Sequence, residues 1–264
     1  MLEIKNLSKT FNKGTLNEKP ALCGIDLTLQ DGDFVSVIGG NGAGKSTLLN
    51  AIAGVWQPDS GSIKLDGNEL IGVPEHKRAK FLGRVFQDPM MGTAPDMMIE
   101  ENLAIAHRRG SKRGLRWMMA PGEREDYKEL LKTLGLGLED RIFAKTRLLS
   151  GGQRQALTLL MAAMKMPKLL LLDEHTAALD PQTAAKVLSI TEELIEENSL
   201  TSLMVTHNMK NAIRCGNRLI MMHEGRIILD IKGEEKKNLR VEDLLKRFAE
   251  ASGDSFSDDR ALLA

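Results

Sequence analysis

Short apolar runs separated by turn signals organise the first third of the chain. Apolar and polar positions alternate over residues 2–7 and 25–29, which predicts two half-buried strands. Asp31-Gly32 predicts a turn, and the continuous apolar run at 34–38 predicts a buried strand. Further elements are expected as a helix at 47–53, a strand at 63–65 with a turn at Asp66-Gly67, and a strand at 84–86.

Helical and strand patterns alternate along the rest of the chain. Residues 88–166 have helical periodicity and no convincing strand, and a four-leucine strand follows at 169–172. A helix is expected at 181–198, because Asp180 can cap its first turn and Pro181 suits its first position. The remaining expected elements are a strand at 203–206, a hairpin of 219–222 and 226–229, a helix with Val241, Leu244, Leu245 and Phe248 on one face, and a mobile polar tail over 252–259.

Strands that alternate with helices indicate an α/β protein with a largely parallel sheet, into which the strandless middle block is inserted as a helical subdomain. The composition supports a sizeable core, since 42% of the 264 residues are hydrophobic. Lys+Arg and Asp+Glu each number 36, so the chain lacks the basic footprint of a nucleic-acid-binding protein, and no nucleic acid is expected as a partner.

Three further features bear on location. Cys23 and Cys215 have no disulfide or metal-site spacing, which fits a reducing cytosol. The amino terminus has no signal-peptide pattern, and no apolar run approaches the about 20 residues of a membrane-spanning helix, so a role at a membrane would need a second chain that crosses it. The basic run at 108–116 is either a solvated loop or a contact for acidic lipid headgroups or a partner.

A glycine-rich loop at 39–46 fits the pattern G-x-x-x-x-G-K-[ST] and lies between a predicted strand and a predicted helix. Backbone N–H groups in such a loop can surround phosphates, with the helix dipole behind them. Lys45 would reach the β- and γ-phosphates, and the hydroxyl of Ser46 would bind Mg²⁺. The loop therefore predicts a nucleoside triphosphate site.

Polar side chains follow three other predicted strands at their carboxyl ends, where ligands of open α/β sheets bind. Asp173 is a candidate Mg²⁺ ligand, and the adjacent Glu174 is the candidate general base, a role that typically contributes ~10²–10⁴ in rate. Gln87 could bind Mg²⁺ or hold a water molecule, and His207 ends another strand. Taken alone, the acidic pair could equally be a strand end that enters solvent, Gln87 is more often a polar loop residue, and His207 is more often an ordinary strand-end histidine.

Residues 149–153, Leu-Ser-Gly-Gly-Gln, predict the start of a helix. Ser150 and Gln153 have the spacing of a capping box, and a helix start with free N–H groups attracts anions. Phe11 is expected in a loop, where it could stack on a nucleotide base or belong to the core.

Taken in order, these motifs resemble the ATP-binding cassette of ABC transporters over about residues 1–232. The matching segments are an aromatic loop at Phe11, a Walker A loop at 39–46, a Q-loop at Gln87, a signature at 149–153, a Walker B end at 173–174, a D-loop at 178–180 and a switch histidine at His207. The resemblance implies a P-loop NTPase core with an N-terminal antiparallel β subdomain and an inserted helical subdomain. Its implied limits are 1–87 and 167–232 for the core, 88–166 for the helical subdomain, and 233–264 for a C-terminal helix and mobile tail.

The resemblance also implies that ATP and Mg²⁺ bind between two copies arranged head to tail, with each ATP held by Walker A of one copy and the signature of the other. His207 would hold the γ-phosphate, and Asp180 would link the two sites. The implied catalytic residues are Glu174, His207 and Gln87, and the implied metal ligands are Ser46, Gln87 and Asp173. The implied nucleotide-binding residues are Phe11, Gly39, Gly40, Asn41, Gly42, Ala43, Gly44, Lys45, Ser46, Thr47, Ser150, Gly151, Gly152, Gln153 and Asp180.

The chain departs from the family pattern at two positions: His175 stands where proline is common, and Gly40 where larger residues are usual. His175 is either a loop residue or a residue that tunes the site, and the first interpretation is favoured. A methionine-rich segment around the Q-loop is either a surface that accepts a membrane subunit or a small packed cluster; it comprises Met90, Met91, Met97 and Met98.

The function expected from the resemblance is ATP hydrolysis that drives a separate membrane permease at the cytoplasmic face of the membrane. Import of a small solute such as an amino acid is expected, with an extracytoplasmic solute-binding protein as a further partner. Two alternatives stay open: a non-transport ATPase such as an iron–sulfur assembly ATPase, and a nucleotide-gated module that barely hydrolyses ATP. The presence of Glu174 and His207 argues against the second.

Overall fold

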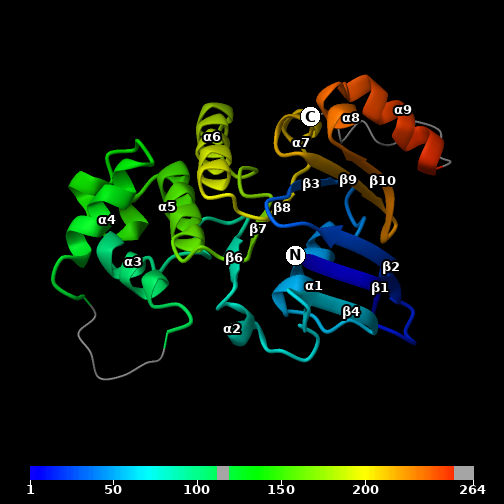
Figure 1. Cartoon of the computed structure of the whole chain (residues 1–264), viewed down its shortest axis with the longest axis horizontal. Helices are drawn as coiled ribbons and strands as arrows, with labels where there is room; N and C mark the ends of the chain where they lie inside the picture. Colours follow the sequence, from blue (N-terminus) through cyan, green and yellow to red (C-terminus); the bar gives the residue numbers. More distant parts are fainter. Residues whose placement is uncertain (112–118, 253–264) are drawn as a thin grey trace. The chain divides into compact units, whose positions relative to one another are not determined.

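The computed structural model describes residues 1–111 and 119–252 (Figure 1). The chain forms two compact units, one of Met1–Arg78 with the chain from Leu200 onward and one of Ala79–Ser199. Within the described residues, no helix combines the length and the apolar character needed to cross a membrane. The expected mobile tail lies outside the described residues from position 253 onward.

The first unit contains an antiparallel sheet in the order β2-β1-β4-β5, as the resemblance implied for the N-terminal region (Figure 1). Its strands are β1 (Leu2–Phe11), β2 (Lys19–Leu29), β4 (Ser60–Leu65) and β5 (Asn68–Glu69). The expectation that Phe11 lies in a loop is wrong. Phe11 pairs with Lys19 at the end of β1, because shifts in register let the two strands continue past their alternating segments.

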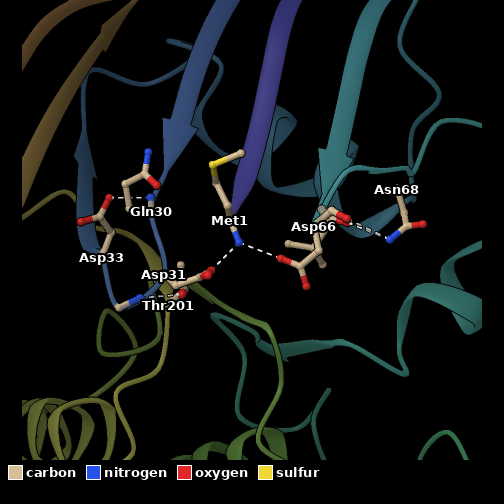
Figure 2. Close-up of polar contacts among 9 residues, drawn as sticks. Met1, Gln30, Asp31, Asp33, Asp66, Asn68 and Thr201 are labelled. Carbon is tan, nitrogen blue, oxygen red and sulfur yellow. Dashed lines mark hydrogen bonds and ion pairs between the residues drawn. The ribbon is translucent and has the colours of Figure 1, made fainter.

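Polar contacts at one end of this sheet hold the connecting turns (Figure 2). The Met1 amino group contacts the carboxylates of Asp31 and Asp66, and the Asp66 N–H donates to the Met1 carbonyl at 2.9 Å. Gly32 N donates to the Thr201 hydroxyl at 2.9 Å. The turn that enters the strand at Phe34–Ile38 is thus connected to the segment that precedes the strand at Ser202–Val205.

The second sheet of the first unit has the order β10-β9-β3-β8. β3 (Phe34–Ile38) is buried at all five positions and runs parallel to both β8 (Ser202–Val205) and β9 (Arg218–His223). β9 and β10 (Arg226–Lys232) form the expected hairpin. The helices of this unit are α1 (Lys45–Ala53), α2 (Glu75–Arg78), α7 (Met209–Arg214), α8 (Glu234–Lys237) and α9 (Val241–Ser252).

The terminal helix α9 uses the apolar face that its sequence predicts. Leu244 and Phe248 are buried in a cluster with Leu219 and Met221 of β9, and Val241 and Leu245 pack against its edge. This burial of apolar surface fixes α9 on the first unit.

The second unit combines two parallel strands, β6 (Leu82–Val85) and β7 (Leu169–Asp173), with helices. The helices are α3 (Ile99–His107), α4 (Glu123–Lys132), α5 (Gly151–Ala163) and α6 (Pro181–Glu197), with 3₁₀ turns at Glu139–Arg141 and Thr146–Leu148. The described part of 88–166 contains no strand, as predicted, apart from one bridge between Met98 and Lys145. The limits of the helical subdomain stay a prediction.

Two residues of the basic run, Arg108 and Arg109, make contacts within the second unit, in contrast to the interpretation of the run as a solvated loop. Arg108 donates to the Glu123 carboxylate at 2.9 Å, and Arg109 donates to the Ala162 carbonyl at 2.8 Å. Burial lowers the pKa of the Arg109 guanidinium from its ordinary value. Arg108 and Arg109 therefore hold α3 to α4 and α5, whereas positions 112–116 of the run lie outside the described residues.

Candidate nucleotide-binding site

The phosphate loop follows directly on the buried strand β3 and leads into α1. Gly44 caps this helix at a φ of 101°, and a Cβ there would lie 2.4 Å from the Ala21 carbonyl oxygen. Only glycine suits this position, because an L side chain would suffer both backbone strain and a collision with backbone. At Gly40, by contrast, a Cβ would meet nothing within 4 Å, which agrees with a position that accepts larger residues.

Lys45 lies inside the curve of the loop. Its Nζ donates to the carbonyls of Gly39 at 2.7 Å and Gly40 at 3.0 Å, and the residue is only 6% exposed. These contacts hold the ammonium group beside the backbone N–H groups of the loop, in a position to meet an anion. At the other end of α1, Arg78 donates to the carbonyls of Ala51 at 2.8 Å and Ile52 at 2.7 Å.

His207 lies at the same sheet edge as the phosphate loop. β3 and β8 are parallel neighbours, with Val37 opposite Val205, and the Thr206 N–H donates to the Val37 carbonyl at 3.1 Å. The carboxyl ends of both strands therefore meet, and His207 follows one of them with an exposed side chain. This unit thus brings together the predicted Walker A loop and switch histidine.

Phe11 is half-buried and makes a T-shaped contact with Trp56, with ring centroids 5.2 Å apart. The Lys9 ammonium lies 5.7 Å from the Phe11 ring centroid. Sequence reasoning missed Trp56, because the pairing of Ser8 with Ser60 that brings these segments together is a tertiary contact.

The second unit brings together a second set of predicted residues. β6 and β7 are parallel, with Val85 opposite Leu172, so Asp173 at the end of β7 and Gln87 and Glu174 just beyond the two strands lie at one edge. Gln87 is exposed. The Arg84 Nη2 lies 3.5 Å from the Asp173 Oδ2, and sequence reasoning missed Arg84 because only the register of β6 and β7 reveals this ion pair.

Glu174 begins a turn in an unusual backbone conformation. Its φ is 44°, a region that residues other than glycine rarely adopt, and the Ala177 N–H donates to its carbonyl at 2.9 Å. Such strain persists only where the surroundings over-determine it, and it concentrates at functional sites. His175, the next residue, is in this turn as expected, but it is only 2% exposed.

The signature segment has the local structure that its spacing predicts. The Gln153 N–H donates to the Ser150 hydroxyl and the Ser150 N–H to the Gln153 side-chain carbonyl, both at 3.2 Å, which confirms the capping box at the start of α5. Asp180 caps α6 in the same way, accepting from the Thr183 N–H at 3.1 Å, with Pro181 at the first position as predicted.

α5 and α6 meet closely at the signature. A Cβ at Gly152 would lie 2.0 Å from the Thr183 Cγ2, so glycine is required there for this contact within the chain. α5 also holds the Q-loop segment, because the Gln155 side chain donates to the Phe86 carbonyl at 2.9 Å and the Arg154 guanidinium contacts the Met90 sulfur. Sequence reasoning missed Gln155, because the helical period does not reveal that its side chain bonds to the segment next to the Q-loop.

Three of the four residues of the methionine-rich segment are exposed, and the fourth, Met97, is half-buried. Met90, Met91 and Met98 are among the exposed large hydrophobic residues, and Met91 is 67% exposed. Of the two interpretations left open by the sequence, exposure favours a surface available to a partner.

The candidate metal ligands are all oxygen donors: the Asp173 carboxylate and the Gln87 amide belong to the second unit, and the Ser46 hydroxyl belongs to the first. Hard oxygen donors of this kind suit Mg²⁺, which is usually held by one or two carboxylates together with substrate phosphates. The residues present therefore fit the ion. Bound there, Mg²⁺ would neutralise charge on the phosphates.

A phosphate loop behind a parallel strand, acidic residues at a second strand end and a capped Ser-Gly-Gly helix start define a P-loop nucleotide-binding cassette. A family model described as ABC transporter matches residues 22–177. A tyrosine transport ATP-binding protein from Clostridioides difficile (strain R20291) is 45% identical over 248 residues, which are 94% of this chain and 98% of that protein.

Solved structures of ATP-binding cassettes are also similar to this chain. The dimeric ATP-binding cassette MJ0796 bound to ADP and phosphate has a TM-score of 0.74 at 30% identity. The matched region covers 88% of this chain and 98% of the MJ0796 chain. The cbiO1 protein of Clostridium perfringens, part of the ABC transporter complex cbiONQ, has a TM-score of 0.75 at 27% identity, with 94% of each chain covered.

The chain belongs to the ABC transporter family as an ATP-binding subunit, an enzyme that hydrolyses ATP in coupling to transport. The predicted fold class is confirmed. The alternative of a cytosolic iron–sulfur assembly ATPase is not favoured, because the curated relatives are subunits of transport systems.

Proposed function

We propose that this chain binds Mg²⁺ and ATP with the residues named above and hydrolyses the nucleotide in a head-to-tail pair of copies. The observation that carries the proposal is the set of complementary half-sites on one chain: a phosphate loop with Lys45 poised on its carbonyls, and a capped Ser150 helix start. A dimeric structure of the similar cassette MJ0796 with ADP and phosphate supports the arrangement.

Each group has a distinct task in this mechanism. Lys45 and the loop N–H groups bind the β- and γ-phosphates, and the N–H groups at the start of α5 in the second copy bind the γ-phosphate from the other side. Glu174 accepts a proton from the attacking water, and His207 and Gln87 orient the γ-phosphate and that water. Phe11 stacks on the base, and Asp180 connects the two sites.

Replacing Glu174 by Gln tests the base. The amide keeps the size of the carboxylate but cannot accept the proton, so kcat for ATP should fall by roughly 10²–10⁴ while ATP binding persists. Turnover is measured by phosphate release, and dimer formation with ATP by light scattering after gel filtration. Glu196→Gln, an exposed change on α6, is the matched control. Substantial turnover by Glu174→Gln would remove Glu174 from this role.

The membrane partner follows from the exposed methionines near the Q-loop. Flexible thioether side chains adapt to apolar partner surfaces, and Met90, Met91 and Met98 offer such a surface on the second unit. An integral membrane permease at the cytoplasmic face of the membrane fits this surface, and the presence of cbiO1 in the complex cbiONQ supports a partnership of this kind. A solute-binding protein outside the membrane would complete an import system.

Affinity purification from membranes tests the partner. A tagged Glu174→Gln chain should recover a protein with several membrane spans, and a Met90→Glu, Met91→Glu variant should lose it, because two buried charges oppose docking. Met166→Glu changes another exposed methionine as a control. Recovery of a soluble scaffold in place of a permease would contradict a transport role.

The cargo that fits best is an aromatic amino acid. A tyrosine transport ATP-binding protein shares 45% identity with this chain across nearly its whole length. Deleting the gene should abolish energy-dependent uptake of labelled tyrosine, and the native chain but not Glu174→Gln should restore it. Unchanged tyrosine uptake in the deletion would exclude this cargo without affecting the ATPase role.

A further inference from the structure

His175 is the buried member of the turn that joins Glu174 to the cap of α6. Its Nε2 lies 3.0 Å from the hydroxyl oxygen of Thr191, a residue in the middle of α6 that is fully buried. The Thr191 hydroxyl in turn lies 2.8 Å from the Val187 carbonyl, to which it donates. The turn is therefore connected to α6 by these two side-chain hydrogen bonds as well as by the backbone that enters the helix at Asp180.

The direction of these two hydrogen bonds follows from the number of protons that the Thr191 hydroxyl carries. A threonine hydroxyl has one proton, and Thr191 donates it in the hydrogen bond to the Val187 carbonyl. The Thr191 oxygen therefore accepts a hydrogen bond from the Nε2–H of His175. This direction requires a proton on Nε2 and does not depend on the state of Nδ1. That N–H is committed to Thr191.

The contact has a consequence for the neighbouring residue. Glu174 has a φ of 44°, which requires support from its surroundings, and a loose turn would release it to the commoner conformations. A proline at position 175 would restrict the backbone through its own ring. A histidine has no such ring in the backbone and can restrict the turn only through what its side chain contacts.

We propose that His175 is a positioning residue for ATP hydrolysis: its hydrogen bond to Thr191 holds the turn 174–177 on α6 and so fixes the direction in which Glu174 leaves the backbone. This proposal rests on the proposed role of Glu174 as the base. Hydrolysis depends on that direction, because a base displaced by even 1 Å loses much of its effect, whereas nucleotide binding by the phosphate loop does not.

A double-mutant cycle tests the bond. His175→Ala and Thr191→Val should each lower kcat by roughly tenfold and leave the KM for ATP within about twofold, and the double variant should be no slower than either single one. His175→Gln, whose amide nitrogen can replace Nε2, and Thr191→Ser, which keeps the hydroxyl, should retain most activity. Ser189→Ala removes an exposed hydroxyl from the same helix and serves as the control.

Amide hydrogen exchange separates positioning from general stability. In the Ala and Val variants, exchange should quicken at 174–180 and stay slow in the centre of α6. Additive effects on kcat, native kcat in His175→Ala, or a raised KM alone would overturn the proposal. Loss of folding in both variants while Thr191→Ser stays folded and His175→Gln is inactive would show a purely structural bond, and would also overturn it.

The two proposals fail separately. If Glu174→Gln retains turnover while the His175 and Thr191 variants are coupled, the base role fails and the bond positions another group. If Glu174→Gln abolishes turnover and the cycle is additive, the base role stands and the His175 bond has no part in it.

Discussion

At the scale of single residues, several long polar side chains are buried because each has found backbone carbonyls to which it can donate. Arg78 is among the largest fully buried side chains of the described residues, and it donates to carbonyls in the last turn of α1 and to that of Val73 at 2.8 Å. A cation at the carboxyl end of a helix is favourable, because the helix dipole is negative there. Burial nevertheless lowers the pKa of Arg78 from its ordinary value.

Replacing Arg78 by Met should therefore destabilise the protein by about 2–4 kcal/mol, since it leaves two buried carbonyls and one half-buried carbonyl without their donor. Urea denaturation without nucleotide measures this change. Lys77→Met, on the exposed side of α2, should change stability by less than about 0.5 kcal/mol. Equal stabilities of the two variants would show that water satisfies the carbonyls.

At the scale of elements, α5 and α6 approach one another closely at the signature because Gly152 has no side chain. Gly152→Ala would force its Cβ against the Thr183 Cγ2, which lies 2.0 Å from that position. The helices would have to separate, and such overpacking costs about 1–3 kcal/mol.

The same contact predicts a compensating change. Thr183→Ser removes the methyl group and keeps the hydroxyl, so the Gly152→Ala, Thr183→Ser double variant should recover most of the stability that Gly152→Ala loses. Thermal unfolding without nucleotide is the measurement. Gly40→Ala, where a Cβ meets nothing within 4 Å, should be tolerated. A double variant no more stable than Gly152→Ala would place the cost elsewhere.

At the scale of the whole molecule, the two compact units divide the predicted site residues between them. Walker A and His207 belong to one unit, and Gln87, the signature, Asp173, Glu174 and Asp180 belong to the other. Neither unit contains a full set of the proposed groups, so the proposed mechanism would need groups from both. In a symmetric pair of copies, each site would also take residues from two chains.

Complementation tests that arrangement. Lys45→Ala and Ser150→Phe should each be inactive alone, because each spoils both sites of its own dimer. A mixture should regain up to roughly a quarter of native turnover, since half of the dimers are mixed and each contains one intact site. Phosphate release measures the recovery. A mixture as inactive as its components, despite mixed dimers being detected, would contradict the head-to-tail arrangement.

Local signals in the sequence were sufficient for much of this protein. The buried strand β3, the Ser150 and Asp180 caps and the apolar face of α9 all follow from side chains acting on their own backbone or from a simple period, so they were predictable. The class of enzyme was predictable too, because the motifs occur in a fixed order along one chain.

Tertiary structure alone decided the rest. The register of β1 with β2 placed Phe11 in a strand, and the register of β6 with β7 placed Arg84 beside Asp173. The packing of a turn onto α6 buried His175 against Thr191. These contacts join segments far apart in sequence or depend on which face a helix buries, and no local propensity encodes them. The sequence by itself determined which groups this ATPase has, and the packing of distant segments determined how those groups are held.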